Sequence, residues 1–337
     1  MKRGSSGYSL VVGVDKPAGM SSHDVVNHVR GIFGERRVGH AGTLDPAATG
    51  VLPILVGPAT RLDAYLTGHD KRYRAWISFG AATDTDDAEG EVIRRGAVPD
   101  EVLDEGFAAG FVAGLVGARK QMPPAYSAIK VDGRRSYERA RAGTIIDMEP
   151  RDIEVKEARL LEISEEGPDG APSWLLELLV SKGTYIRAIA RDVGRDIDCP
   201  AHLAALRRCA SGRLALEDCV GLDALAELKD RAALDPVDLL GCRFAYLDEG
   251  AAARVANGAR LSAGEVELFE RRHLPLADEL NCCSSGVRES GREAADGELV
   301  AMVAENRLVA LYGYDGQGAC YRARCVFQTG VSRGGRV

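Results

Sequence analysis

The chain has 337 residues, 45% of them hydrophobic and 28% charged, and a formal net charge of −7. That length supports one large domain or two ordinary ones with a sizeable core, and the composition is that of an ordinary globular protein. No window is apolar for long enough to span a membrane, and the first apolar run is too short for a signal peptide because Gly13 and Asp15 interrupt it. The sequence therefore predicts a cytoplasmic protein.

The N-terminal part of the chain predicts strands that alternate with one helix. "SLVVGVDKP" is a short strand that ends in a turn at residues 16–19. "SSHDVVNHVRGIFG" is a helix, because its apolar residues recur at helical spacing between a serine N-cap (Ser21 or Ser22) and a glycine stop, Gly34. A glycine-rich loop over residues 39–50 then leads into the buried strand "VLPILVG". "KRYRAWISFGAAT" predicts another strand, with these side chains on one face: Tyr73, Ala75, Ile77 and Phe79.

The middle of the chain predicts a mixture of helices and strands. Residues 84–118 change from acidic to helical. Within the basic residues 119–150, "SAIKVDGRRSYERARAG" begins as a strand, turns at Asp132 and Gly133, and continues as a short basic helix. "SWLLELLVSKGTY" predicts a strand, and a helix follows from Thr184 because the apolar residues then recur at helical spacing. "CPAHLAALRRCASG" predicts a second short helix that ends in two arginines.

The texture of the sequence changes after about residue 240. Strand-turn-strand patterns with Gly, Asp and Asn turns dominate the C-terminal part, as in "GELVAMVAENRLVALYGYDGQGACYRARCVF". We therefore expect a boundary near residues 235–245, between a large domain over residues 8–240 and a small β-rich domain over residues 241–331. A polar stretch near residues 270–297 predicts an exposed loop or a disordered insertion in the second domain.

Charge is unevenly distributed along the chain. Residues 84–105 carry nine acidic residues and two arginines. By contrast, residues 119–151 carry eight basic and four acidic residues, and residues 182–213 carry seven basic and three acidic residues. An acidic protein with two basic segments can still present one positive face to a nucleic acid. The alternative is that each charged run is an ordinary solvated surface.

Neither metal binding nor disulfide bonding is indicated by the cysteines and histidines. The eight cysteines form no C-x-x-C pair, and the six histidines form no H-x-x-x-H pair. A zinc site needs closely spaced ligand pairs of this kind. The sequence therefore predicts reduced, mostly buried thiols and no metal site.

The segment "RRVGHAGTLDPAATGVLPILVG", residues 36–57, holds a single acidic residue, Asp45. Asp followed by Pro in a glycine-rich loop is commonly a turn, in which the carboxylate accepts backbone N–H groups. The glycines also let the backbone approach a ligand closely, so the same carboxylate can act as a nucleophile. Paired-acid catalysis would need a second acid, and the next acids along the chain lie in the exposed-looking run 84–91. The local pattern leaves both readings open.

Five stretches, in order along the chain, resemble the TruB-type tRNA pseudouridine synthases. "VGHAGTLDPAATGVLPILVGPATRL" resembles the signature of that family, and "DKPAGMSSHDVV" resembles its first motif. The other three are "DKRYRAWISFGAATDTDDAEGE", "QMPPAYSAIKVDGRRSYERARAG" and "SKGTYIRAIARDVGRDIDCPAHLAALRRCASG". Together they run from residue 11 to about residue 222, roughly two-thirds of the chain. This resemblance favours a catalytic role for Asp45 over a turn alone.

The resemblance implies roles for six residues. Asp45 would be the catalytic residue, and Arg187 would pair with it and keep it ionised by lowering its pKa. Tyr73 would stack on the target base and is a candidate for removing the proton from C5. Three residues would contact the nucleotide: His40, near the flipped nucleotide, Tyr185, and Leu206, as an apolar wall.

The resemblance also implies a fold, a substrate and the absence of cofactors. We expect an α+β domain with a mixed, largely antiparallel sheet, flanking helices and a central RNA-binding cleft, followed by a small PUA-type β-rich domain. The implied reaction is the isomerisation of uridine to pseudouridine at position 55 in the T-loop of tRNA, by base flipping. It requires no metal, ATP or redox cofactor. The partner would be the T-arm stem-loop of tRNA, with residues 119–151 as an RNA-contacting insertion, and we expect a monomer with no obligate protein partner.

Three other functions remain open at this point. A non-catalytic RNA-binding or RNA-folding protein could keep the same scaffold, although it would have no need of a carboxylate at Asp45. A glycoside hydrolase would use a nucleophilic acid, but it needs a second carboxylate. A pseudouridine synthase of the kind guided by small nucleolar RNA would keep the chemistry and change the RNA.

Overall fold

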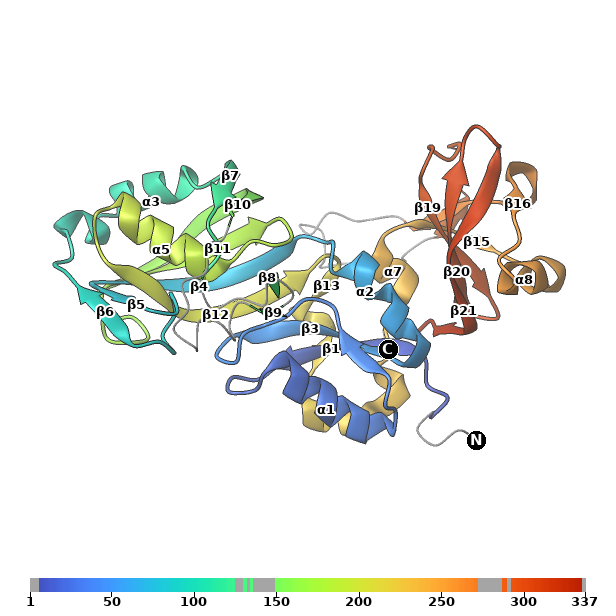
Figure 1. The fold of residues 1–337 in the computed structure, drawn as a ribbon, viewed down its shortest axis with the longest axis horizontal. Coiled ribbons are helices and arrows are strands. Elements are labelled where there is room, and N and C mark those ends of the chain that lie inside the picture. The colour runs from blue at the N-terminus through green and yellow to red at the C-terminus, as the bar shows by residue number, and fades with distance from the viewer. Residues whose placement is uncertain are drawn as a thin grey trace.

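The computed structural model describes residues 6–124, 130–131, 134–135, 149–271, 287–289 and 292–334. Two large sheets lie one after the other along the longest axis of the molecule (Figure 1). The first sheet contains ten described strands, in the order β14-β1-β3-β12-β4-β11-β10-β7, with β2 beside β3 and β13 beside β12. Its pairs are antiparallel except β1 with β14 and β12 with β3, which are parallel. The predicted mixed, largely antiparallel sheet is confirmed.

The strands of the first sheet come from all parts of the N-terminal two-thirds of the chain. They are β1 (Leu10–Lys16), β2 (Val38–His40), β3 (Thr49–Val56), β4 (Lys71–Phe79), β7 (Gly117–Gln121), β10 (Arg151–Ser164), β11 (Ser173–Val180), β12 (Ala201–Ser211), β13 (Leu214–Ala215) and β14 (Cys219–Val220). Two small hairpins stand apart from this sheet, β5 (Ala81–Thr83) with β6 (Val92–Arg95), and β8 (Lys130–Val131) with β9 (Arg134–Arg135). The turn predicted at residues 132–133 and the basic helix predicted after it lie outside the described residues.

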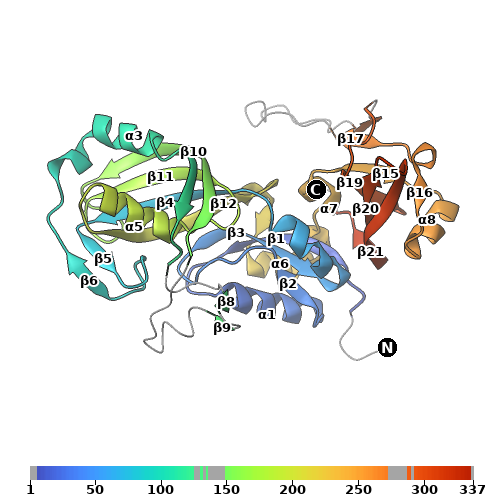
Figure 2. The same ribbon diagram turned by 45° about the horizontal axis from the view of Figure 1, so that its top comes forward.

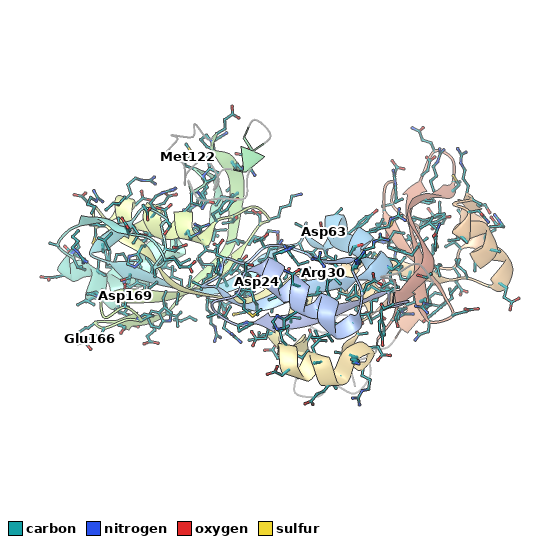
Figure 3. All side chains as sticks on the ribbon, turned by 60° about the horizontal axis from the view of Figure 1, so that its bottom comes forward. Asp24, Arg30, Asp63, Met122, Glu166 and Asp169 are labelled. Carbon is teal, nitrogen blue, oxygen red and sulfur yellow. The ribbon has the colours of Figure 1, made fainter. Side chains whose placement is uncertain are left out.

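Helices cover the first sheet at both ends. They are α1 (Ser22–Phe33), α2 (Asp63–Leu66), α3 (Glu105–Ala113), α5 (Ile186–Asp196), α6 (Leu222–Leu228) and α7 (Pro236–Leu240). The helix α1 begins and ends as predicted, because Ser21 accepts a hydrogen bond from the backbone N–H of Asp24 and Gly34 adopts the left-handed conformation. α3 and α5 pack over β4, β10, β11 and β12, whereas α1 and α6 pack beside β1 (Figure 2). Glu166 and Asp169, in the turn between β10 and β11, mark the end of the first sheet that lies away from the second sheet (Figure 3).

The helix predicted for "CPAHLAALRRCASG" is wrong, because residues 201–211 form the strand β12. β12 lies between β3 and β4 and pairs with β4 from Ala201–Phe79 to Ser211–Lys71. The alanines and leucines of this stretch favour a helix locally, but the ladder of hydrogen bonds to two neighbouring strands decides the conformation. The two arginines of this stretch, Arg207 and Arg208, therefore lie within a strand between β3 and β4 and not at the end of a helix.

The second sheet begins at β15 and forms the C-terminal part of the described chain. Its strands are β15 (Arg243–Tyr246), β16 (Leu261–Ser262), β17 (Phe269–Arg271), β18 (Val287–Glu289), β19 (Leu299–Ala304), β20 (Arg307–Asp315) and β21 (Cys320–Ser332), with one helix, α8 (Glu249–Ala256), beside them. The last three strands, β19, β20 and β21, pair antiparallel in sequence order, as the strand-turn-strand pattern predicts. Much of the predicted polar insertion, residues 272–286 and 290–291, lies outside the described residues.

The two sheets share one apolar core. Val11 and Leu55 of the first sheet belong to the same buried cluster as Phe244 and Phe327 of the second. A buried ion pair, Arg333 Nη2 to Asp235 Oδ2 at 2.7 Å, lies at the same junction. The strands β1 and β3 of the first sheet therefore contribute to two cores, one shared with α1 and α6 and the other shared with the second sheet.

Candidate active site

Asp45 lies in the loop of residues 41–48, which joins β2 to β3 and which we call the Asp45 loop. Its backbone carbonyl accepts a hydrogen bond from the N–H of Ala48 at 3.1 Å, so the main chain does turn here. Its side chain, however, points to a helix from elsewhere in the chain and is 41% exposed. Asp45 is thus a turn residue in its backbone, while its carboxylate remains accessible.

Two side chains near the start of the chain hold the Asp45 loop in place. Lys16, at the end of β1, is fully buried, and its Nζ donates to the carbonyl of Pro46 at 3.0 Å and to those of Pro17 and Met20. Ser22, the first residue of α1, exchanges two hydrogen bonds with the backbone of Leu44, at 2.8 and 2.9 Å. The loop is therefore fixed on both sides of Asp45.

Arg187, in the first turn of α5, forms an ion pair with Asp45. The distance from its Nε to Asp45 Oδ2 is 3.0 Å, and only 7% of the arginine side chain is exposed. The Nη1 atom of the same guanidinium lies 3.5 Å from Asp87 Oδ2 and donates to the carbonyl of Thr85 at 3.1 Å. One buried cation therefore serves two carboxylates, of which Asp45 is the more exposed and Asp87 is nearly enclosed.

The acids of residues 84–91 are not all exposed, which corrects the expectation from sequence. Asp87 is only 8% exposed, because the turn folds back on β12 through hydrogen bonds between Ala88 and Leu203 and between Leu203 and Asp86. A second carboxylate therefore does lie near Asp45, so the argument against a glycoside hydrolase from a missing second acid fails. Asp87 Oδ1 accepts hydrogen bonds from Thr85 Oγ1 and the N–H of Glu89, which ties this carboxylate to its own turn.

The pKa of Asp45 is raised above its ordinary value, contrary to expectation. Burial of the carboxyl group is the largest cause, and the negative charge of Asp87 adds to it. Arg187 and Lys16 act in the expected direction and lower the pKa, but they do not outweigh burial. The site therefore presents a carboxylate that is more basic than that of an ordinary aspartate and is held in place by a cation.

The predicted aromatic and apolar groups come together beside the Asp45 loop. Tyr73, on β4, is 7% exposed and packs in one cluster with Leu44 and Ala48 of the loop. Leu206, on β12, packs against this cluster and lies opposite Ala75 of β4. Because α5 contributes Ile186 to the same cluster, the elements that carry Asp45, Tyr73, Arg187 and Leu206 converge on one place.

His40 and Tyr185 are close in sequence to the ion-paired residues Asp45 and Arg187. His40, on β2, directly precedes the Asp45 loop, and its Nδ1 atom is buried with no hydrogen-bond partner among the described residues. Burial lowers the pKa of His40. Tyr185 is the N-cap of α5, and its backbone N–H and carbonyl both pair with the side-chain amide of Gln121, at 2.9 and 3.0 Å.

Sequence reasoning missed the residues that support the site. Lys16 was read only as part of a turn, and Asp87 only as part of an acidic run. Of the arginines in "LRR", Arg208 reaches the Asp45 loop, yet only Leu206 was singled out in that motif. Nothing in their residue types separates these side chains from surface residues, and a buried position is what reveals them.

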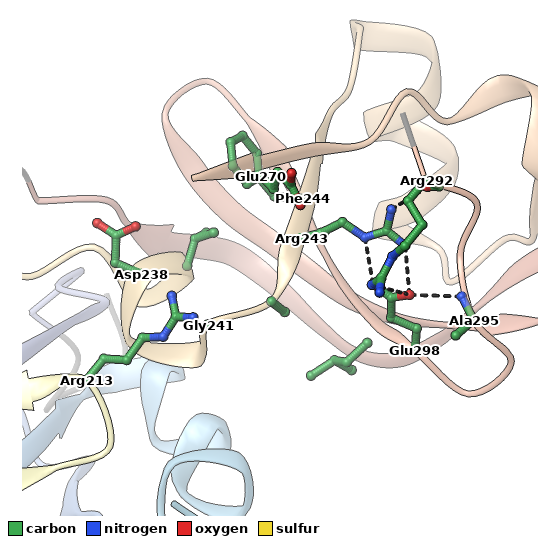
Figure 4. A pocket seen from close by; sticks show the side chains of 12 residues that line it. Arg213, Asp238, Gly241, Arg243, Phe244, Glu270, Arg292, Ala295 and Glu298 are labelled. Atoms are coloured by element: carbon green, nitrogen blue, oxygen red, sulfur yellow. Dashed lines mark hydrogen bonds and ion pairs between the residues drawn. The ribbon is translucent and has the colours of Figure 1, made fainter. Parts of the chain in front are cut away.

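A cavity of about 540 Å³ lies at the junction of the two sheets, apart from Asp45. Arg213 and Asp238 line one side of it, and the ion pair of Arg243 with Glu298 lines the other (Figure 4). None of the predicted site residues lines it. In the part of the chain that the structure describes, no group of His, Cys, Asp and Glu is placed to hold a metal ion, and no helix is long and apolar enough to cross a membrane.

Comparison with known proteins defines the class to which this site belongs. Residues 30–186 match the family model described as TruB family pseudouridylate synthase, N-terminal domain. A protein of Thermobifida fusca named tRNA pseudouridine synthase B is 44% identical over 278 residues, which cover 80% of this chain and 94% of that protein. A protein of Shouchella clausii with the same name is 40% identical over 256 residues, covering 74% of this chain and 84% of that protein.

The fold agrees with these matches. A chain from a structure of an H/ACA RNP bound to a substrate RNA containing 2′-deoxyuridine superposes with a TM-score of 0.65, at 23% identity, over 95% of this chain and 85% of that one. The sequence matches thus define the class of the protein, which is that of the pseudouridine synthases. The chain belongs to the TruB family of pseudouridylate synthases.

Proposed function

We propose that this chain isomerises uridine to pseudouridine at position 55 in the T-loop of tRNA, with Asp45 as the catalytic residue. The observation that carries the proposal is the ion pair of Asp45 with the buried Arg187, on a loop fixed from both sides. The relatives named tRNA pseudouridine synthase B, which this chain covers over most of their length, support the substrate. A glycoside hydrolase is not supported, since the family match lies across the Asp45 loop itself.

The reaction rearranges bonds within one nucleotide. The N1–C1′ bond breaks, the base rotates, C5 bonds to C1′, the proton on C5 leaves and N1 takes up a proton. No atom is added or lost overall, so the reaction as written draws on no redox cofactor, metal or ATP. It requires an ionised carboxylate beside C1′ and the base, which is the role we assign to Asp45.

The neighbouring residues would bind and flip the target nucleotide. Extruding a uridine from a folded loop costs a few kcal/mol, and stacking it on an aromatic ring recovers about 1–3 kcal/mol. Tyr73 is the aromatic platform in this proposal and accepts the C5 proton, directly or through water. Leu206 forms the apolar wall, and His40 and Tyr185 contact the flipped nucleotide.

The T-arm stem-loop of tRNA is the RNA partner in this proposal, and no obligate protein partner is needed. We place the protein in the cytoplasm as a monomer with a catalytic domain over residues 8–240, in which residues 119–151 contact RNA, and a PUA-like domain over residues 241–331. This chain covers 94% of the length of the Thermobifida fusca relative, so it contains most of what that tRNA pseudouridine synthase B contains. RNA guidance by a separate ribonucleoprotein would be indicated if the purified chain acted only on guided substrates.

Binding of the stem-loop is expected to weaken steeply with added salt. The exposed basic residues of segments 119–151 and 182–213, such as Lys120 and Lys182, would neutralise phosphates and release their counterions, whereas Arg187 and Arg208 are buried and would not. With about four phosphate contacts, affinity should fall about 100-fold between about 50 and about 200 mM salt. Fluorescence anisotropy of a labelled stem-loop measures this, and a flat salt response would remove the basic segments from the account of RNA binding.

The proposed function is tested with the purified full-length protein. It is incubated with an unmodified T-arm stem-loop, without cofactor and in the presence of a chelator, and the digested RNA is analysed for pseudouridine. A matched stem-loop with cytidine in place of the target uridine is the control. Pseudouridine in the first RNA alone would support the proposal, and tight binding without product would move the assignment to an RNA-binding protein.

A further inference from the structure

Arg208, on β12, contacts the Asp45 loop from within the protein core. Its side chain is one of the largest that is fully buried, at 1% exposure. Its Nη2 donates to the carbonyl of Gly42 at 3.0 Å and its Nη1 to the carbonyl of Thr43 at 3.3 Å. Its Nε donates to the carbonyl of Val51, in β3, at 2.6 Å. One guanidinium therefore joins the start of the Asp45 loop to the strand that follows it.

The surroundings of Arg208 are those of a positioning group and not of an ordinary ion pair. All the hydrogen bonds described for its guanidinium go to backbone carbonyls, and no carboxylate pairs with it among the described residues. The neighbouring charges include other cations. The pKa of Lys71 is lowered to about 8, mainly by burial and secondly by the positive charge of Arg208. Arg208 also lowers the pKa of His40. A buried cation without a carboxylate partner is costly, so the contacts with the loop must repay it.

The backbone of Arg208 fixes the other end of the loop. Arg208 lies opposite Gly50 in the parallel pairing of β12 with β3. A Cβ atom added at Gly50 would come within 2.2 Å of the Arg208 carbonyl oxygen, and Gly50 has a φ of +101°. The strands β3 and β12 approach too closely there for any side chain at position 50. The Asp45 loop is thus held at its start by the Arg208 side chain and at its end by the Arg208 backbone.

We propose that Arg208 is a positioning residue for catalysis, whose planar guanidinium sets the place of the Asp45 carboxylate relative to Arg187. The inference rests on the proposed function, because it concerns the rate of the same reaction. The three hydrogen bonds of Arg208 leave from three different nitrogens of one rigid plane, whereas a lysine ammonium donates from a single atom, so we expect that lysine does not reproduce them. Arg208 touches neither the substrate nor the reacting atoms in this account, and acts through the loop.

The test is the single-turnover rate of Arg208→Lys with the T-arm stem-loop at saturating protein. A displacement of the carboxylate by about 1 Å can lower a rate by about 100-fold, and we expect a loss of that order with RNA affinity unchanged. The pH profile supplies a second readout. Asp45 faces Arg187 on α5, Lys16 on β1 and Asp87 in the turn after β5. If the loop moves away from Arg187, the acidic limb of the rate profile should shift to higher pH.

Arg243→Lys is the control, because Arg243 is also a buried arginine that donates to backbone carbonyls, in the second sheet and away from Asp45. It differs from Arg208 in that it also pairs with a carboxylate, Glu298. The Arg243→Lys variant should lose stability but keep the wild-type rate and pH profile. Gly42→Ala tests the same contact from the loop and does not depend on how well the lysine variant folds. Its added methyl would lie in ordinary contact distance, 3.5 Å from Arg208 Nη1, but the φ of +94° strains any side chain there and shifts the carbonyl that Arg208 binds. The same fall in rate and upward shift are therefore expected.

The outcomes separate this inference from the function on which it rests. A slow Arg208→Lys with a shifted acidic limb, beside an unaffected Arg243→Lys, supports a positioning role. A wild-type rate in both Arg208→Lys and Gly42→Ala would overturn it, as would equal losses in Arg208→Lys and Arg243→Lys with an unshifted limb. If the wild-type protein itself forms no pseudouridine, the proposed function fails first.

Discussion

Asp45→Asn is expected to lower the rate of pseudouridine formation by about 10⁴-fold, the upper end for loss of one acid–base group. Asparagine has nearly the same shape as aspartate but carries no charge and cannot act as a carboxylate nucleophile or base. Its amide oxygen can still accept the hydrogen bond from Arg187, and the side chain at this position is 41% exposed. The fold and the affinity for RNA should therefore change little.

The measurement compares single-turnover pseudouridine formation in the variant and the wild type on the same stem-loop, together with RNA affinity and thermal stability. Asp223→Asn is a suitable control, since Asp223 is an exposed residue on α6. A variant at Asp45 that kept more than a small fraction of the wild-type rate would show that the carboxylate is not the reacting group. A variant that lost both activity and RNA binding would point to a structural role instead.

Arg187→Gln is expected to have the second large effect, on both activity and stability. It leaves Asp45 and the buried Asp87 without their shared cation. Breaking a fully buried pair costs about 3–5 kcal/mol, and about 2 kcal/mol is expected here because Asp45 is partly exposed. Urea denaturation measures the loss, and an unchanged free energy of unfolding would show that the pair does not support the fold.

The pH dependence of Arg187→Gln follows from the direction of the Asp45 pKa. Arg187 lowers that pKa against burial, so its removal raises the pKa further. Because the Asp45 pKa is already raised above its ordinary value, we expect the acidic limb of activity to move to still higher pH in the variant. Lower pH should reduce the activity of the variant but should also reduce its loss of stability relative to the wild type. A carboxyl group whose pKa is raised by folding binds a proton more readily when folded, so the stability deficit of the variant should shrink as pH falls through that pKa. Equal deficits at pH 5 and pH 8 would contradict this.

Local pattern was sufficient for elements whose sequence and environment agree. α1 carries a serine cap, a regular apolar spacing and a glycine stop, and all three appear in the structure. The strand β4 alternates as predicted, and its buried face includes Tyr73 and Ile77. β12 was misread as a helix because its alanines and leucines favour one, and only the neighbouring strands β3 and β4 impose the extended conformation.

The sequence by itself determined the family, the reaction class and the identity of the candidate catalytic residues, because these depend on residue types at set spacings around Asp45. Only the tertiary structure decided how that carboxylate is supported. Lys16, Asp87 and Arg208 come from strands and turns far apart in the chain, and their burial is a property of the assembled sheet. The direction of the Asp45 pKa was likewise decided by burial, which sequence spacing does not contain, and burial outweighed the arginine that the motif supplies.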